Sequence, residues 1–200
     1  MGVKGARRGL YQLGAVALVL ASSSVRADVD WATGRVAVTG AGPADLRAPS
    51  PAIARVAAER VARKTARARL ETELRALPWA EGVRLEEAWL EGILATVTTD
   101  AVRYQSDGSV VVESHVDLVP ANATAALVVD ARKLGLAPVL GATIVAGKAR
   151  YDGPLRWVRA APAGVPVVLA VSARRGTLEI PTAALPAARG AVVVWIAERR

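Results

Sequence analysis

The order of apolar and polar positions separates a short leader from the rest of the chain. Residues 10–21 form a mostly apolar run that follows Lys4, Arg7 and Arg8 and precedes three serines. A run of about a dozen residues suits the core of a signal peptide and is shorter than the roughly 20 residues that span a bilayer. The pattern therefore predicts a signal peptide over residues 1–27, with Asp28 as the first mature residue.

Export through this peptide would place the mature chain in the periplasm or outside the cell. Small residues at Val25 and Ala27 occupy the two positions that signal peptidase reads, which disfavours the alternative of an uncleaved membrane helix. The pair Arg7-Arg8 leaves both the Sec and the twin-arginine export routes open. Later apolar runs are strand-sized, so we expect no transmembrane segment in the mature chain.

The clearest helical pattern covers residues 51–76, which are rich in Ala, Arg, Glu and Leu, contain no glycine and begin with a proline. At 100° per residue, one face of this helix carries small or apolar side chains and is expected to be buried. Those residues are Ala54, Ala58, Val61, Ala62 and Thr65. The opposite face carries charged side chains. Those residues are Arg60, Arg63, Lys64, Arg67 and Glu71.

Shorter elements are predicted before and after this helix in the sequence. Residues 34–40 alternate like a strand, and residues 83–94 have apolar positions at helical spacing. Residues 96–105 and 109–118 read as two strands of a hairpin in which Gly108 supplies a positive φ. Val110, Val112, Val116 and Leu118 are expected on one side of the second strand, and Val111, Glu113, His115 and Asp117 on the other.

From residue 126 the sequence pattern changes to short apolar segments separated by glycine and proline. This pattern predicts a β-rich C-terminal lobe with a short helix near residues 181–188. The predicted strands are 127–130, 139–145, 165–171 and 191–197. The mature chain is thus divided into an α+β domain at residues 28–120 and a β-rich lobe at residues 121–200, packed on the domain.

Charge is concentrated on the long helix. Four of the 26 basic residues precede Asp28, which leaves 22 basic against 18 acidic residues, and residues 51–76 alone carry a net charge of +4. The strip formed by Arg60, Arg63, Lys64 and Arg67 could face anionic lipid or an acidic partner. It could equally be a solvated face with Glu59–Arg63 and Glu71–Arg75 pairs. Nucleic acid is not expected as a partner of an exported chain with this modest excess.

Few residues offer catalytic or metal-binding chemistry. Glu113, His115 and Asp117 alternate on one predicted strand and could converge on a metal, but His115 is the only histidine and the chain has no cysteine. No serine lies in a Gly-x-Ser-x-Gly elbow. We therefore predict no metal site, no cofactor and no catalysis. The alternative of a hydrolase would have to depend on His115. For Asp130 we expect a structural role, in which its carboxylate binds Arg132 or nearby backbone N–H groups.

Several segments, taken in order, resemble the twenty-kilodalton outer-membrane lipoprotein family of bacterial envelope proteins, which includes flagellum-associated lipoproteins and the N-terminal domain of a flagellar assembly protein. These segments are 30–36, the Gly-Ala-Gly-Pro turn, the alanine-rich helix, 106–112, 128–138 and the tail. The resemblance implies an α+β fold, in which helices pack on a small antiparallel sheet, followed here by the β-rich C-terminal lobe. Unlike the lipoproteins, this chain has no lipid-bearing cysteine.

The resemblance also implies an envelope role in structure, assembly or protein interaction, and it transfers no catalytic residues. Expected partners are envelope proteins, including a second copy of the chain. The alternative hypothesis is a protein that binds a small ligand or makes peripheral contact with anionic lipid through Arg60, Arg63, Lys64 and Arg67.

Overall fold

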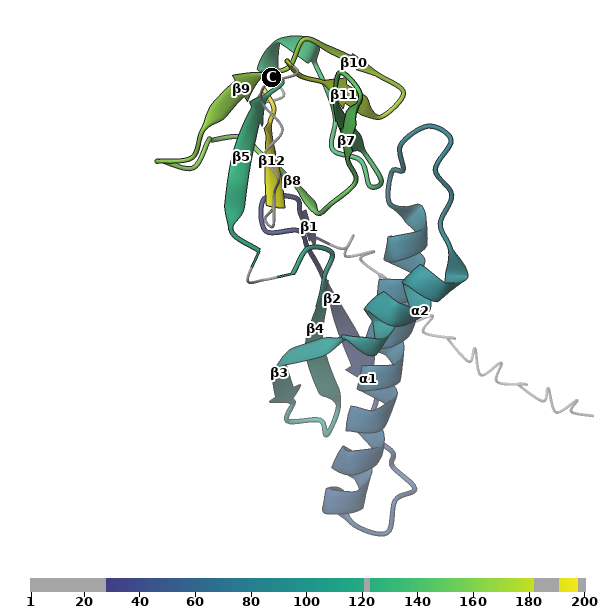
Figure 1. Ribbon diagram of the computed structural model, residues 1–200. Helices are drawn as coiled ribbons and strands as arrows, with labels where there is room; N and C mark the ends of the chain where they lie inside the picture. The colour runs from purple at the N-terminus through teal and green to yellow at the C-terminus, as the bar shows by residue number, and fades with distance from the viewer. Residues whose placement is uncertain (1–27, 121–122, 182–190, 198–200) are drawn as a thin grey trace, which may run out of the picture.

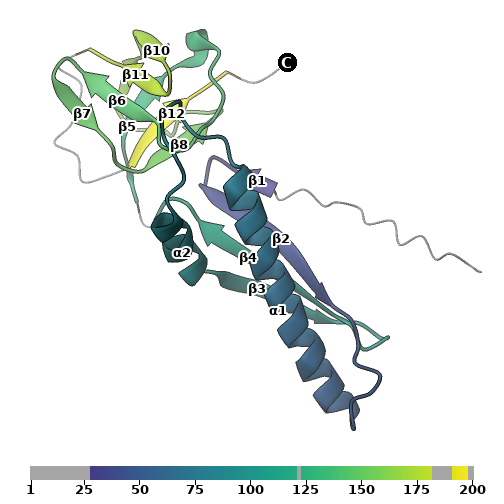
Figure 2. The same ribbon diagram turned by 90° about the vertical axis from the view of Figure 1, so that its right-hand side faces the viewer.

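The computed structural model describes residues 28–120, 123–181 and 191–197. It is an α+β fold in which two helices pack on one face of an antiparallel sheet, with a β-rich lobe at one end (Figures 1 and 2). The signal peptide predicted over residues 1–27 and most of the helix predicted over 181–188 lie outside the described residues. The elements are β1 (Asp28–Asp30), β2 (Arg35–Gly42), α1 (Pro51–Ala76), α2 (Glu87–Ala95), β3 (Thr98–Tyr104), β4 (Val110–Asp117), β5 (Ala125–Asp130), a 3-10 turn (Arg132–Leu134), β6 (Thr143–Ala146), β7 (Ala149–Tyr151), β8 (Leu155–Val158), β9 (Val167–Leu169), β10 (Ser172–Arg174), β11 (Thr177–Glu179) and β12 (Ala191–Trp195).

The first sheet has the strand order β1-β2-β4-β3, and every neighbouring pair in it is antiparallel. The predicted hairpin is confirmed: β3 pairs with β4, and Gly108 adopts a φ of 82° in the turn between them. This left-handed conformation is available to glycine without steric cost. The predicted first strand is confirmed as β2, which extends to Gly42.

Helix α1 has the bounds that the sequence predicts. Ser50 caps it by accepting a hydrogen bond from the Ile53 backbone N–H at 3.3 Å, and Pro51 occupies the first turn, where its missing N–H has no cost. The side chains buried along it are spaced four residues apart, so the buried row turns by about 40° around the helix axis at each step. They are Ala58, Ala62, Ala66, Leu70 and Leu74. Val61 was expected on the buried face but is 45% exposed. It lies beside the row of buried residues and not within it.

Helix α1 lies very close to β2. A Cβ atom added to Gly40 would overlap the Ala62 carbonyl oxygen, and one added to Gly42 would overlap the Ala58 carbonyl oxygen. Glycines on the strand therefore face alanines on the helix, and the two backbones meet without intervening side chains. The small residues predicted for this helix face explain the close approach.

Helix α2 begins at Glu87, not at Val83 as its apolar spacing predicts. Residues 78–80, which lie between the two helices, pair with the second lobe. Trp79 forms an isolated β-bridge with Leu140, the Leu140 N–H donates to the Pro78 carbonyl at 2.8 Å, and the Ala80 N–H donates to the Leu140 carbonyl at 2.8 Å. A turn follows these pairings, in which Gly82 has a φ of 83°, and residues 83–86 have no regular secondary structure before α2 begins.

The described residues of the C-terminal lobe form two four-stranded sheets. One has the order β8-β12-β5-β9 with every pair parallel, and the other has the order β10-β11-β6-β7 with one parallel pair. Four predicted strands appear as β5, β6, β9 and β12. The strand predicted over residues 139–145 is shorter and later, because Leu140 pairs with the first lobe. The short strands β1, β7, β8, β10 and β11 were not expected from the pattern.

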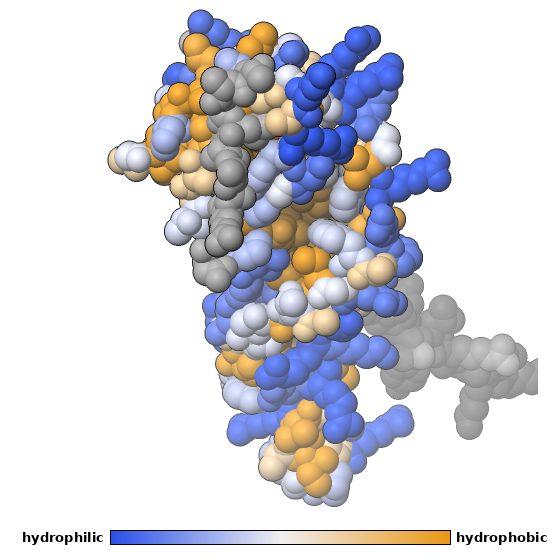
Figure 3. Space-filling model, viewed as in Figure 1, coloured by the Kyte–Doolittle hydropathy of each residue, from blue (hydrophilic) through white to orange (hydrophobic). Residues whose placement is uncertain are grey.

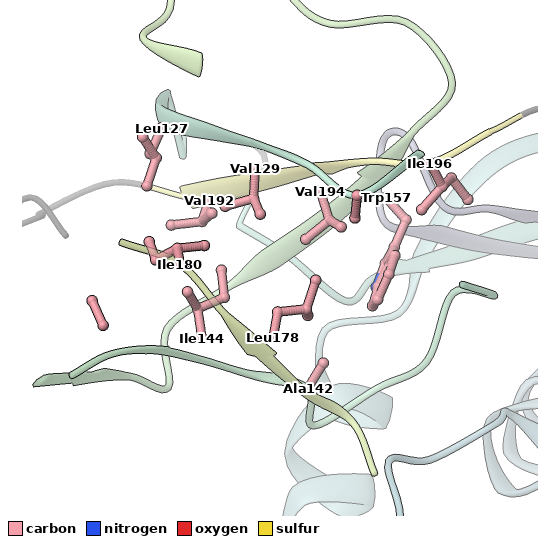
Figure 4. Packing of buried hydrophobic residues seen from close by; sticks show 12 residues of the cluster. Leu127, Val129, Ala142, Ile144, Trp157, Leu178, Ile180, Val192, Val194 and Ile196 are labelled. Carbon is pink, nitrogen blue, oxygen red and sulfur yellow. The ribbon is translucent and has the colours of Figure 1, made fainter. Parts of the chain in front are cut away.

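A single apolar cluster fills the space between these two sheets. Figure 4 shows Val192 and Val194 of β12 directed toward the same interior as Ile144, Leu178 and Ile180. A second cluster lies between the helices and the first sheet and includes Leu70, Leu74 and Leu90. Trp31 contacts both clusters and so connects the two cores. Among the described residues, neither helix is long and apolar enough to span a membrane.

Candidate functional site

Large apolar side chains are exposed around the start of α1, at the end of the molecule that lies away from the C-terminal lobe (Figures 1 and 2). Leu46 is 93% exposed, and Ile53 and Val56 are 52% and 60% exposed. Figure 3 shows apolar residues gathered at this end with hydrophilic residues around them. We call Leu46, Ile53 and Val56, together with Val61, Arg60 and Lys64 beside them, the distal surface.

Local structure explains why this end is uncovered. Only the small side chains of Ala58 and Ala62 pack on the sheet there, whereas farther along the helix Leu70 and Leu74 are buried. Ile53 and Val56 are exposed, and no residue in the described part of the chain covers them fully. Exposed aliphatic side chains that cluster, instead of being scattered, mark interaction sites on soluble proteins. These residues were not predicted from the sequence, although two bulky residues outside the alanine face of the helix were a readable signal.

The predicted basic strip is not a uniform surface. Arg63 pairs with Glu59 at 2.7 Å and donates to the Thr99 hydroxyl at 2.9 Å. Arg67 donates to the Leu94 carbonyl at 2.6 Å. Arg60 and Lys64 are exposed and have no hydrogen bond or ion pair within the described part of the chain. The strip therefore contributes two side chains to internal structure and two to the distal surface.

Glu59 organises one border of the distal surface. The Tyr104 hydroxyl donates to its Oε2 at 2.7 Å, while Arg63 donates to its Oε1. These hydrogen bonds, that of Tyr104 first, hold the pKa of Glu59 below its ordinary value, and the same bond raises the pKa of Tyr104. Glu59 is thus kept ionised and engaged, so it is not available to neutralise Arg60 or Lys64.

Two arginines of α1 hold α2 by its ends. Arg67 binds the Leu94 carbonyl near the C-terminus of α2, where unpaired carbonyls favour a cation. Arg75 binds both oxygens of Glu87 at 2.8 and 2.9 Å in the first turn of α2, and it also pairs with Glu71 as predicted. The Arg75 hydrogen bonds lower the pKa of Glu87. Two basic residues of α1 therefore fasten the helices together.

The only histidine of the chain is buried, contrary to its expected place on a polar outer face. His115 is 6% exposed, and its Nδ1 lies 2.7 Å from Asp100 Oδ2. A β-bulge between Thr99 and Ala101 inserts Asp100 as an extra residue in β3 and brings its carboxylate to the histidine. Alternation along a single strand could not reveal a bulge in its neighbour.

The three residues considered for a metal do not converge. Glu113 pairs with Arg103 at 2.5 Å, and Asp117 pairs with Arg35 at 3.1 Å and lies 3.9 Å from His115 Nε2. Within the described residues, no group of three or more His, Cys, Asp and Glu side chains could hold a metal ion. The polar atoms around His115 are thus committed to neighbours in the sheet.

Asp130 has the structural task that the sequence predicts. It accepts hydrogen bonds from Arg132 Nε and Nη2 at 2.9 and 2.7 Å and from the Arg132 backbone N–H at 3.2 Å. The guanidinium of Arg132 stacks on Trp195, 3.4 Å from the ring centroid. The Arg132 hydrogen bonds hold the pKa of Asp130 below its ordinary value.

Val167, Leu169 and Val171, in and just after β9, are exposed as well. The distal surface is the candidate site for recognition because its exposed apolar side chains adjoin Arg60 and Lys64, which have no internal partners among the described residues. Comparison of the chain with family models, with curated proteins and with solved structures finds no significant match.

Proposed function

We propose that the chain is an exported, non-catalytic component of the cell envelope that binds another envelope protein through its distal surface. The observation that carries this proposal is the exposure of Leu46, Ile53 and Val56 at the free end of α1. Burying such aliphatic side chains against a partner is favourable by about 25 cal/mol per Å² of apolar surface. Tyr104, which is 54% exposed, and Arg60 add residue types that are enriched at protein interfaces.

The predicted signal peptide and the family resemblance support the envelope part of the proposal. The shape supports the binding part, because α1 carries the distal surface away from the C-terminal lobe, and a partner can dock there without contacting that lobe (Figure 2). The chemistry that would suggest an enzyme is instead engaged in structural pairs, above all at His115 and Asp130.

Site-specific photo-crosslinking in cells that express the full chain would test this proposal. A photoreactive residue at Val56 is expected to give a discrete crosslinked partner, and the same residue at Ala68, exposed on α1 beyond the distal surface, is expected to give none. Ile53→Glu should abolish a crosslink formed at Val56, whereas Ala68→Glu should preserve it. Equal crosslinking at both positions, or none at Val56, would contradict the proposal.

Anionic lipid is a second candidate partner, favoured by the placement of the unpaired Arg60 and Lys64 beside Ile53 and Val56. Each basic residue near an anionic membrane contributes about 1 kcal/mol, so replacing both with glutamine should weaken binding about thirtyfold. Flotation with vesicles that contain or lack phosphatidylglycerol measures this effect. Arg84→Gln removes one exposed charge elsewhere and is the matched control. Binding that changes neither with the phosphatidylglycerol content of the vesicles nor with the salt concentration would exclude anionic lipid as the partner.

A further inference from the structure

A cavity of about 460 Å³ opens between the two lobes. Its walls come from the first lobe, through Trp31, Trp79 and Trp89, and from the second lobe, through Leu140, Arg150 and Asp152. Ligand sites in proteins commonly have volumes of about 300–1,000 Å³ and occur where domains meet. A second cavity of about 640 Å³ shares Trp31 and Val139 in its walls, so the space near the first cavity is large enough for more than one ring.

Three of the five tryptophans of the chain line the first cavity, and each is only partly buried. The rings of Trp79 and Trp89 meet edge to face, with centroids 5.2 Å apart and an interplanar angle of 83°. Two perpendicular indoles form a corner. Leaving three partly exposed indoles in a cavity wall is unfavourable in water, and a ring-shaped ligand that covers them would recover this free energy.

The indole N–H of Trp79 differs from those of Trp157 and Trp195, which donate hydrogen bonds. Trp157 donates its Nε1–H to the Val139 carbonyl at 3.1 Å, and Trp195 donates to the Arg159 carbonyl at 2.9 Å. Trp79 Nε1 is buried without a hydrogen-bond partner in the described part of the chain. An unpaired buried donor typically costs about 1–3 kcal/mol. No hydrogen bond to a described residue therefore fixes the orientation of this indole.

A polar trio lies at one side of the same cavity. Arg150 donates to both oxygens of Asp152 at 2.7 Å and to the Thr143 hydroxyl at 3.2 Å, and Thr143 donates to Asp152 at 3.0 Å. The side chains of Arg150 and Asp152 are 65% and 56% exposed, so they remain accessible from solvent. The trio has no net charge and presents both donors and acceptors. It therefore suits hydroxyl and amide groups, which donate and accept, better than a cation or an anion.

We propose that this cavity binds a neutral carbohydrate, with the C–H faces of its rings against the indoles and its hydroxyls at the trio of Thr143, Arg150 and Asp152. A pyranose ring combines an apolar face with polar edges, as the cavity wall does. Its C–H bonds, polarised by the ring oxygens, are attracted to the negative face of an indole. This inference is independent of the distal surface.

Isothermal titration calorimetry on the protein purified after expression of the full chain tests the proposal. The probes are the linear trimers of glucose, of N-acetylglucosamine and of galactose, with sialic acid and choline as charged comparisons. We expect at least one neutral trimer to bind and to change the tryptophan fluorescence. Trp89→Ala should weaken that binding about tenfold. No binding of any neutral trimer, or tighter binding of a charged probe, would overturn the proposal.

Two rim variants keep the test valid if Trp89→Ala disturbs α2. Arg150→Gln and Asp152→Asn alter exposed side chains outside the buried clusters, and each should weaken binding severalfold without changing the circular dichroism spectrum. Arg103→Gln is the matched control, because it breaks an exposed Arg–Glu pair on the first sheet. Equal affinities in the rim variants and this control would show that the sugar does not bind at the trio.

Discussion

The close contact between α1 and β2 predicts that Gly40→Ala will destabilise the fold. The new Cβ would overlap the Ala62 carbonyl oxygen and lie 2.5 Å from the Ala66 backbone nitrogen. Both neighbours are backbone atoms, so no side-chain rotation can relieve the overlap. Because unstrained contacts of this kind need about 3.5 Å, the helix would have to move outward by about 1 Å.

The size of the effect follows from that movement. Overpacking a well-packed core typically costs about 1–3 kcal/mol, and this site belongs at the upper end because the whole helix must shift. We expect Gly40→Ala to lower the unfolding free energy by about 3 kcal/mol. For a chain of this size, that loss corresponds to a fall in Tm of about 6–12 °C.

Urea denaturation, followed by circular dichroism at the helical band, measures this loss. Gly92→Ala is the matched control, since Gly92 lies in α2 and a Cβ atom added there would meet no atom within 4 Å, so alanine should stabilise the helix by about 0.5–1 kcal/mol. Adding Ala66→Gly to Gly40→Ala should restore little, because the backbone overlaps remain. A Gly40→Ala protein within about 0.5 kcal/mol of wild type would refute the reasoning.

Three further predictions concern single side chains. Leu70→Ala, at a fully buried position, should lower the unfolding free energy by about 2–5 kcal/mol in urea denaturation, whereas Leu46→Ala, at an exposed one, should change it by less than about 0.5 kcal/mol. The pKa of Asp130 lies below the unfolded value of about 3.9, so its carboxylate stabilises the fold above about pH 4, and this contribution is lost as the pH falls through the folded-state pKa. Asp130→Asn should therefore make stability fall less steeply below pH 4, and parallel wild-type and variant curves would contradict this. Arg75→Gln breaks the exposed pair with Glu87 and should leave the unfolding free energy nearly unchanged, yet hydrogen exchange should accelerate in α2 and not in the core of α1.

Local signals in the sequence predicted the elements whose structure depends on near neighbours. Ser50 and Pro51 mark the start of α1, Pro78 follows its end, and Gly108 marks the hairpin turn. In each case the deciding physics is the conformational preference of a few consecutive residues. The small side chains expected on the buried face of α1 likewise allow its close contact with Gly40.

Elements and sites that depend on distant partners could not be predicted in the same way. The strand-like pairing of residues 78–80 with Leu140 and the contact of His115 with Asp100, which lies at a bulge on another strand, both depend on residues distant in the sequence. The strands of three residues are too short to show a period. For the candidate site, the sequence identified Arg60 and Lys64 but missed Ile53 and Val56, because their exposure depends on where the sheet ends beneath α1.

The position of β12 has a consequence for how the protein folds. This strand lies between β8 and β5 and pairs with both, yet it comes from residues 191–195, after every other strand of the lobe has been synthesised. Until those residues emerge, β5 and β8 have no common neighbour, and the apolar cluster between the two sheets lacks Val192 and Val194. The first sheet and α1 need no residue beyond Asp117 for their pairing, so they can form while the chain is still emerging, and the C-terminal lobe closes last.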